Sequence, residues 1–420
     1  MKKILLTILC LIFTTSVSAS TEFEVIVDVD SGAGYDYSSF SNWETACQTD
    51  LTATTTKVFG HSGITGAVGD GSTVTGQTSS ATGRIVHATS DQILLDTITG
   101  TFSSGEIMQV SVGNSVTITD VGAGSWMLVT FKNSSGSTAG AGTMDGYTCD
   151  TDNYVKLWCD PDDIYRHEGV DENGKFTFTD NLVISDQHII VDGFIMDGRK
   201  IVSNSDNRSG TTGSGGIIEN CIVSGIWAPG GDLAIQNYGF HQGMIIRNNI
   251  VYDCGVPLGS VFSGRNFTAI GTTRNTFIHN NTIYGIYNND LNGGDAIGIS
   301  NTSSGEVYNN VVMNLFSEND LETYYVFGGT THDYNASGDS SATGTNSLIN
   351  VADTQFTETS SGIEDFHLAT GSDLIGTGTD LSSDFTNDID NDTRSDPWDI
   401  GADEYIQTLF PTVTLGAYQG

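Results

Sequence analysis

Basic residues are scarce in this 420-residue chain: Lys and Arg number 15 against 51 Asp and Glu, which gives a formal net charge of −36 at pH 7. Such a chain repels nucleic acids and anionic membrane surfaces, and we expect neither as a partner. A long anionic polysaccharide would also be repelled unless a local basic groove or bound cations intervened. The simplest interpretation of the charge is solubility, or adaptation to a salty medium.

Proline is rare as well, with 5 residues against 51 glycines. This balance is typical of a turn-rich all-β protein. Disorder is not expected, because apolar residues make up 37% of the chain and occur in regular short runs.

Long hydrophobic runs are absent apart from one at the N-terminus. Residues 1–19 have the pattern of a signal peptide, with Lys2-Lys3 as the charged start, Ile4–Phe13 as the apolar run and Val17-Ser18-Ala19 as the cleavage site. The apolar run is too short to span a bilayer. We therefore expect a secreted, extracellular protein without membrane insertion.

Cysteine numbers only 6, and Cys10 lies in the signal peptide. Export permits disulfides, and the preferred pair is Cys149 with Cys159, which flank a loop rich in Tyr and Asp. Cys254 falls at an apolar position of the repeats described next, so we expect a small core residue there. No Cys/His spacing is typical of a zinc site.

One short phrase recurs across residues 189–315, as a β-branched run, a polar pair and a second β-branched run. Counted at equivalent positions, its spacings are 28, 28, 32 and 29 residues, and such a near-constant period predicts a solenoid. The positions counted are Asp192, Asn220, Asn248, Asn280 and Asn309.

The clearest copy is Arg247-Asn248-Asn249-Ile250-Val251, preceded by Ile245-Ile246. Runs this short are strands, since a helix needs roughly 10 residues or more. Asn tolerates the left-handed backbone region, so an Asn pair can form a sharp bend between strands. Stacking brings equivalent Asn residues into register, where their amides can bond along the column. A β-sandwich with accidental Asn repeats is the alternative, but sandwich strands recur roughly every 8–12 residues.

With these repeats, the chain over residues 170–405 resembles the pectate-lyase-like family of right-handed parallel β-helix proteins. Two closing phrases, Asp365-Phe366-His367-Leu368 and Asp399-Ile400-Gly401-Ala402-Asp403-Glu404-Tyr405, are similar to the last coil of secreted bacterial members. The resemblance implies an all-β right-handed parallel β-helix and structural roles for His367 and Tyr405. It leaves function open, because the family includes polysaccharide lyases, glycoside hydrolases, phage tailspikes and adhesins.

The N-terminal region, residues 20–58, should contain an alternating strand and a short capping helix. We expect Ser41 to cap this helix with Glu44 in a capping box, and Trp43 to pack beneath it. Such a helix would cover the exposed end of the solenoid.

Residues 59–120 differ, with short strands between Gly-rich turns, including a strand at 66–68 and a hairpin at 100–106. They resemble a small β-domain of phage and virion-associated proteins. The resemblance implies an inserted interaction or carbohydrate-binding module, and a loop domain without a ligand is the alternative. The β-helix would then run over 121–405, followed by a tail at 406–420.

A lyase of this family needs a basic residue to abstract a proton, and cations to neutralise the adjoining carboxylate. The strands expected along its groove, at 233–237, 268–272 and 296–299, contain no Lys or Arg. The basic residues nearby fall in turns of different coils, and no two of them form a matched Lys/Arg pair. They are Arg199, Lys200, Arg208, Arg265 and Arg274. The lack of a matched basic pair makes a lyase the less favoured enzyme.

Glycoside hydrolysis needs two carboxyl groups roughly 5 to 10 Å apart, one protonated and one charged. Asp232, Asp290 and Asp295 precede the same strands, in coils stacked about 4.8 Å apart, and are the candidate catalytic residues. The candidate substrate-binding residues are Trp227, Tyr284, Tyr287 and His241. The competing interpretation is that Asp occupies β-helix turns for backbone reasons alone.

The stretch Asp388-Ile389-Asp390-Asn391-Asp392 alternates carboxylates in a manner that suits calcium. Asp388, Asp390 and Asp392 could hold one ion, although in similar proteins this loop is often only a polar turn. No other cofactor is expected.

Two functions stay open from the sequence. The first is a secreted or virion-associated protein that binds a polysaccharide or cell-surface glycan, or that serves a structural, adhesive role. The second is a polysaccharide-degrading enzyme, either a carboxylate-based glycoside hydrolase or a lyase. The missing basic pair and the appended β-domain favour the first. Trimers are common among tailspikes, but nothing in the sequence specifies a homotrimer.

Overall fold

The structure, a computed structural model, describes residues 20–30, 34–133, 138–203, 215–239, 241–261, 264–318 and 322–406. The predicted signal peptide lies outside the described residues, as do residues 407–420 of the predicted tail. No helix within the described ranges is long and apolar enough to cross a bilayer.

The described part of the chain is all-β apart from one helix, with several long parallel sheets and a small closed barrel. Within those residues the first sheet has nine strands: β1 (Thr21–Asp28), β8 (Ser125–Lys132), β10 (Val155–Trp158), β13 (Ile189–Asp192), β16 (Ile217–Glu219), β19 (Met244–Arg247), β22 (Thr276–His279), β25 (Gly305–Tyr308) and β28 (Thr331–Asp333).

Two further parallel sheets run beside the first. The second consists of β11 (Thr177–Phe178), β14 (Ile195–Asp197), β17 (Ile222–Ser224), β20 (Ile250–Ser260), β23 (Thr282–Asp290), β26 (Val311–Ser317) and β29 (Ala336–Ser337). The third consists of β9 (Thr143–Met144), β12 (Leu182–Ile184), β15 (Ile201–Ser203), β18 (Leu233–Asn237), β21 (Phe267–Thr272), β24 (Ala296–Asn301) and β27 (Glu322–Phe327).

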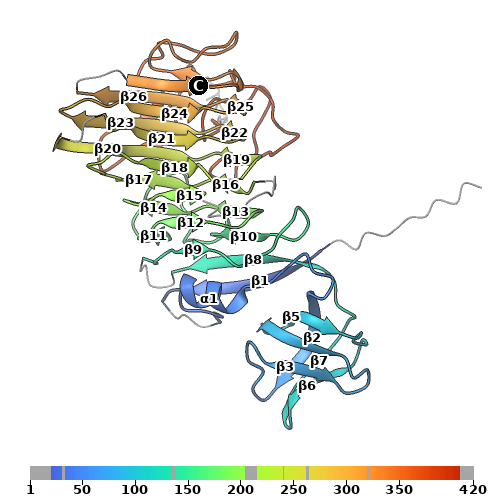
Figure 1. Ribbon diagram of the computed structural model, residues 1–420. Helices are drawn as coiled ribbons and strands as arrows, with labels where there is room; N and C mark the ends of the chain where they lie inside the picture. Colours follow the sequence, from blue (N-terminus) through green and yellow to red (C-terminus); the bar gives the residue numbers. More distant parts are fainter. Residues whose placement is uncertain are drawn as a thin grey trace, which may run out of the picture.

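From β10 onwards the chain passes through the first, second and third sheets in turn. Each pass adds one parallel strand beside that of the previous pass, in register: Ile218 pairs with Ile246, and Ile222 with Ile250. Figure 1 shows these strands stacked along one axis. The arrangement is compatible with a β-helix solenoid, as the repeat period predicts.

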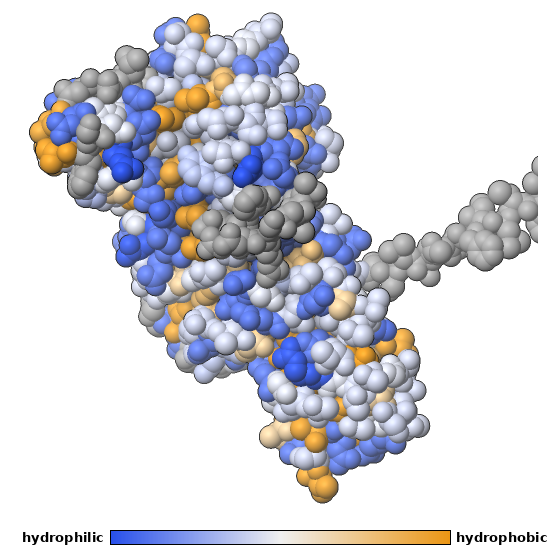
Figure 2. Space-filling view, viewed as in Figure 1, coloured by the Kyte–Doolittle hydropathy of each residue, from blue (hydrophilic) through white to orange (hydrophobic). Residues whose placement is uncertain are grey.

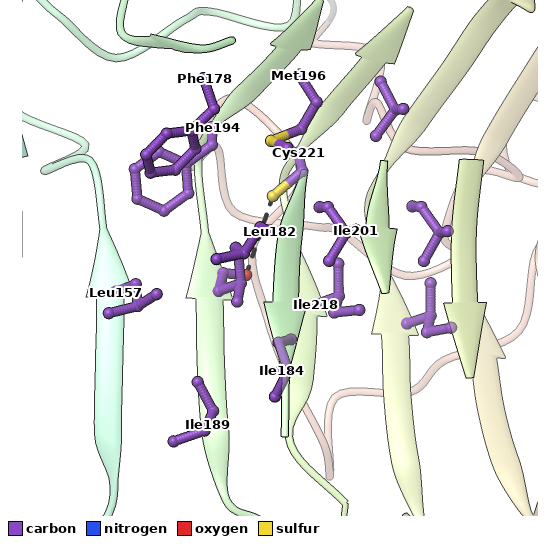
Figure 3. Close-up of a cluster of buried hydrophobic side chains, with 14 of the residues drawn as sticks. Leu157, Phe178, Leu182, Ile184, Ile189, Phe194, Met196, Ile201, Ile218 and Cys221 are labelled. Carbon is purple, nitrogen blue, oxygen red and sulfur yellow. Dashed lines mark hydrogen bonds between the residues drawn. The ribbon is translucent and has the colours of Figure 1, made fainter. Parts of the chain in front are cut away.

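Alternation along these short strands turns every second side chain toward the interior. In the first sheet, from β13 to β25, one inward column is apolar in each pass and has no exposed surface. Its members are Val191, Ile218, Ile246, Ile278 and Val307. Figure 3 shows side chains from all three sheets meeting in this interior. Because each pass buries its inner surface against its neighbours, the stack rather than the single pass is the stable unit.

The first Asn of each repeated phrase forms the bend between the first and second sheets. Asn220, Asn248, Asn280 and Asn309, the outer Asn column, have φ of 52°, 52°, 51° and 57°. The prediction of a left-handed Asn bend is therefore confirmed. Strand register pairs Asp192 with Glu219, so the residue equivalent to Asn220 is Gly193, with φ of 84°, and not Asp192.

The second Asn points inward and is fully buried. In the inner Asn column (Asn249, Asn281, Asn310 and Asn335), each Oδ1 accepts the backbone N–H of the preceding pass at 3.0 Å. The amide groups also bond to one another at 2.9 to 3.1 Å, which confirms the expected amide column. Cys221 takes the equivalent place in the preceding pass, where its backbone N–H donates to Asn249 Oδ1 but its side chain adds no amide to the column.

The N-terminal helix α1 (Phe40–Cys47) follows β1, but its predicted cap is wrong. Ser39, not Ser41, is the N-cap and accepts a hydrogen bond from Asn42 N at 3.2 Å, while Glu44 accepts from Gln48 Nε2. A start at Phe40 directs Phe40, Trp43 and Cys47 into the core together, so burial of the apolar face sets where the helix begins. Trp43 is fully buried, as expected.

Between α1 and β8 the chain forms the closed barrel, which Figure 1 shows at one end of the stack. Its strands are β2 (Lys57–Thr65), β3 (Thr73–Gly76), β4 (Thr82–Ala88), β5 (Gln92–Thr99), β6 (Ile107–Ser111) and β7 (Asn114–Ile118). The strand predicted at 66–68 is an irregular loop, because Gly66 adopts φ of 69° and Ala67 N donates to Asn114 Oδ1. The hairpin predicted at 100–106 forms later, as β6 and β7.

The barrel contacts the stack through both apolar and charged residues. Its own core includes Ile85, whereas the neighbouring Val86 points out of the barrel into the main core. His87, nearly buried, has its Nδ1 2.9 Å from Asp70 and its Nε2 3.3 Å from Asp36. Burial disfavours the imidazolium, but hydrogen bonds to these two carboxylates outweigh it and raise the pKa of His87 to about 9.

The C-terminal segment (residues 339–405) returns along the outer Asn column and includes the antiparallel pair β30 (Phe356–Glu358) and β31 (Asp365–Leu368). Asn248, Asn280 and Asn309 each donate through Nδ2 to a backbone carbonyl of this segment, at 2.7 to 3.1 Å. Phe356 and Phe366 form a second apolar core against the outward side chains of the second sheet. The outer Asn column therefore both bends the chain and holds its return.

Candidate functional site

Asp232 and Trp227 both line one surface pocket, formed where the chain passes from the second sheet to the third. The turn Ala228–Gly231 closes with Gly231 N donating to Ala228 O at 3.1 Å, and it delivers Asp232 to the start of β18. There Lys200 Nζ lies 2.7 and 2.9 Å from the two carboxylate oxygens of Asp232. The pocket has a volume of about 230 Å³ and is lined by Asn181, Gly198, Arg199, Lys200, Ile226, Trp227, Ala228 and Asp232.

Trp227 forms an aromatic patch together with Tyr287 and Phe316. The rings of Trp227 and Tyr287 are nearly parallel, with 5.8 Å between centroids and 19° between planes. They meet because Gly255, which lies between them in register, has no side chain. Phe316 follows Tyr287 in the next pass, and Trp227 and Phe316 are 42% and 41% exposed. Trp227 thus contacts a second ring and also borders the pocket.

Tyr284 and His241, also predicted to bind substrate, lie elsewhere and are buried. Tyr284 belongs to the second apolar core, with 5.4 Å between its ring centroid and that of Phe366. His241 is 1% exposed, and its Nδ1 is 2.6 Å from Ser203 Oγ. Both side chains are occupied by packing, so the structure does not bring them to the Trp227 pocket.

The three candidate catalytic carboxylates do not share an environment. Asp290 ends β23 in the second sheet, is 1% exposed and accepts Asn292 N at 3.0 Å. Asp295 precedes β24 in the third sheet, where its backbone N–H donates to Asn266 Oδ1 and its carbonyl accepts from Phe267 N. Only Asp232 lines the pocket, as one half of an ion pair. The structure therefore gives no support to a hydrolytic carboxylate pair at this place.

A second groove lies on the outer face of the first sheet, and the sequence interpretation missed it. The residue just before each bend points outward in every pass and lies in register with its neighbours. This pre-bend column consists of Trp158, Asp192, Glu219, Arg247, His279 and Tyr308. The signal was present in the repeated phrase itself, as an outward position that changes chemistry from copy to copy.

The acidic side chains Asp192 and Glu219 of this groove are each paired with basic side chains. Lys156 Nζ lies 2.7 Å from Asp192 Oδ2, and Arg166 lies 3.0 Å from the other oxygen. Burial alone would raise the pKa of the Asp192 carboxyl, but Arg166 and Lys156 outweigh it and lower that pKa. One pass along, Arg247 holds Glu219 at 2.6 Å, and the space beside these pairs is about 310 Å³.

Lys156, Arg166 and Arg247, which the sequence interpretation did not consider, all line this one groove. Asp192 and Glu219 are paired in adjacent strands, about 4.8 Å apart along the stack. That spacing suits two catalytic carboxyl groups, but each of the two is already held in an ion pair with a basic side chain. The groove offers hydrogen bonds and charge rather than general-acid chemistry.

The predicted calcium ligands are directed to different partners. Asp388 is 1% exposed and accepts backbone N–H groups of Asp390, Asp392 and Glu404 at 2.8 to 3.0 Å. Asp390 Oδ2 is 2.7 Å from His367 Nε2, and Asp392 is exposed. Asp388 therefore organises the turn, and the calcium site stays a prediction that this geometry does not favour.

Cys149 and Cys159 are both free, so the preferred disulfide is wrong. The Cys149 thiol lies at the start of β10, where it accepts a hydrogen bond from the backbone of Val155. Cys159 follows the other end of that strand. Four strand residues separate the two ends by about 13 Å, well beyond the roughly 7 Å that a disulfide spans between Cα atoms. Cys254 is fully buried in the main core, as expected.

Comparison with known proteins adds no assignment. No protein-family model matches the chain. No curated protein matches it in sequence.

Proposed function

We propose that this chain is an exported right-handed parallel β-helix protein of the pectate-lyase-like type, and that it binds neutral glycans in the Trp227 pocket. The observation that carries the proposal is that an exposed indole and the Lys200–Asp232 ion pair line the same small cavity. Sugar rings present an apolar face and a rim of hydroxyl groups. An aromatic ring facing polar side chains complements both.

The size and charge of the pocket narrow the ligand class. A volume of about 230 Å³ is below that of sites for drug-sized ligands, which begin near 300 Å³, so it suits one sugar unit of a chain. Asp232 can accept from hydroxyl groups, while Lys200 and Arg199 can donate to them. The net charge of −36 repels anionic chains, which favours a neutral glycan.

The distribution of surface hydropathy agrees with a local site. On the face shown in Figure 2, hydrophilic residues cover most of the surface and hydrophobic residues form separate spots. Binding would therefore depend on a few side chains rather than on a broad apolar surface.

The test is a panel of immobilised neutral and acidic polysaccharides, probed with purified protein and two aromatic variants. Trp227→Ala should weaken binding about tenfold, equivalent to about 1.4 kcal/mol, through loss of ring stacking. Tyr35→Ala is the matched control, because Tyr35 is 39% exposed, lies between β1 and α1 and does not line the pocket. Equal binding by wild type and Trp227→Ala, or no binding to any glycan, would overturn the proposal.

The same panel distinguishes binding from degradation. New reducing ends without unsaturated sugars would reveal a glycoside hydrolase, and unsaturated ends would reveal a lyase. Asp295→Asn separates glycan binding from glycan cleavage. Asp295 lies outside the pocket, so this substitution should leave binding intact. A glycan-cleaving activity that disappears in Asp295→Asn would replace the binding proposal with the hydrolase.

A further inference from the structure

We propose that His367, Asp390 and Asp403 form a binding site for one divalent transition-metal ion of the zinc class. One ligand atom from each residue lies within 4.8 Å of the other two. The residues come from β31, from the turn at 388–392 and from the closing phrase at 399–405. An ion at this place would join three separate parts of the C-terminal segment.

The second sphere of the site is already arranged for a metal. His367 Nδ1 is 2.5 Å from Asp365 Oδ1, which fixes the ring and directs Nε2 toward Asp390, 2.7 Å away. A histidine that binds a metal through one nitrogen usually donates the other N–H to a carboxylate in this manner. Leu368 N donates to Asp403 Oδ2 at 2.7 Å and orients the third carboxylate.

Asp390 has capacity left for an ion. Its Oδ2 faces His367, whereas its Oδ1 is buried and has no hydrogen-bond partner among the described residues. A buried carboxylate oxygen without a donor is costly, and a cation would satisfy it.

The loop before β11 leaves no room for a side chain beside these ligands. Gly169 has φ of 70°, and a Cβ there would lie 2.8 Å from Asp390 Oδ1 and 2.9 Å from His367 Nε2. A methyl group at residue 169 would therefore press on two of the three ligands while adding no charge and removing no donor.

The ligand set selects the ion. Calcium and magnesium prefer shells made only of oxygen, whereas zinc, manganese and iron(II) accept imidazole together with carboxylates. Two carboxylates balance a dication. Three protein ligands leave a further position for water or for the second oxygen of Asp390. The alternative without a metal is a protonated His367 held between Asp365 and Asp390.

The experiment titrates Zn²⁺, Co²⁺, Mn²⁺ and Ca²⁺ into chelator-treated full-length mature protein, with calorimetry for affinity and Co²⁺ absorbance for nitrogen and oxygen ligation. We expect one Zn²⁺ per chain, bound more tightly than Ca²⁺. Asp390→Asn, which keeps a hydrogen-bond acceptor for His367, should weaken Zn²⁺ binding at least about 100-fold, and Asp365→Asn about 10- to 100-fold.

Two further variants serve as controls. Asp392→Asn removes an exposed carboxylate two residues from Asp390 and should leave Zn²⁺ affinity unchanged. Gly169→Ala should weaken binding without removing a ligand, because its Cβ would press on Asp390 and His367 and its backbone would be strained at a φ of 70°. Circular dichroism establishes that each variant is folded.

Three outcomes overturn the proposal. The first is a folded wild-type protein that binds none of the transition ions. The second is Zn²⁺ affinity that Asp390→Asn leaves unchanged. The third is preferential Ca²⁺ binding that Asp392→Asn abolishes, which would restore the calcium site of the 388–392 turn.

Discussion

Removing one rung of the inner Asn column should destabilise the whole stack. Asn281 Oδ1 accepts from Asn249 N and Nδ2 at 3.0 and 2.9 Å. Its Nδ2 donates to the carbonyls of Ile246 and His279 and to Asn310 Oδ1, at 2.9 to 3.0 Å. Asn281→Ala deletes all five hydrogen bonds and leaves the buried Asn249 N–H without its acceptor.

The magnitude follows from these contacts. A buried donor without a partner costs about 1–3 kcal/mol, and each lost hydrogen bond contributes about 0.5–1.5 kcal/mol. Since the bonds share atoms and are not additive, we expect Asn281→Ala to lower the free energy of unfolding by about 3–5 kcal/mol. Asn281→Asp should cost at least as much at neutral pH, because an oxygen then faces two carbonyls, and this cost should fall as the pH is lowered and the carboxyl is protonated.

Urea unfolding followed by circular dichroism measures the effect. Asn42→Ala, which changes an exposed Asn on α1, is the control and should shift stability by no more than about 0.5 kcal/mol. A loss below about 1 kcal/mol for Asn281→Ala, with an unchanged unfolding slope, would refute the reasoning that the amide column stabilises the stack.

Three other predictions follow from single contacts. Gly255→Ala should destabilise or prevent folding, because its Cβ would lie 2.0 Å from a backbone oxygen of the next pass, whereas at Gly69 a Cβ meets nothing within 4 Å and Gly69→Ala should fold normally. The raised pKa of His87, about 9 against an ordinary 6.5, means that its ion pairs stabilise the protein fully below pH 6.5 and lose this effect as the pH rises through 9. His87→Asn should remove that part of the decline in urea midpoints between pH 6.5 and 9. Asn309→Gly keeps the left-handed bend but loses two hydrogen bonds to the C-terminal segment, so hydrogen exchange there should speed up, whereas Asn220→Gly should leave it unchanged.

Features that depend on neighbours in sequence were predictable. The left-handed Asn bends follow from a phrase of five residues, and the period follows from counting the copies of that phrase along the chain. The residue that caps the helix was not predictable from the sequence, because Ser39 and Ser41 are equally good caps and the burial of Phe40 decides between them.

Features that depend on distant contacts were not predictable from one sequence. Arg394 NH2 donates to Asn248 Oδ1 across 146 residues, and no local pattern encodes that pairing. Likewise, the sequence predicts Tyr284 to be a surface aromatic residue, but in the folded chain it packs against Phe366 and is buried. Trp227 and Asp232, both predicted from the sequence as site residues, line one pocket because they flank a single four-residue turn.

The repeated phrase assigns a separate task to each of its positions, and this explains where variation is tolerated. The first Asn must adopt positive φ and the second must fit an amide column, so both are constrained by the backbone. The residue before them points outward and has neither duty, and there the chain carries Trp158, Asp192, Glu219, Arg247, His279 and Tyr308 in successive passes. A ladder of unlike functional groups thus arises at an outward position whose chemistry the fold does not dictate, and functional residues of a stacked repeat are best sought at such positions.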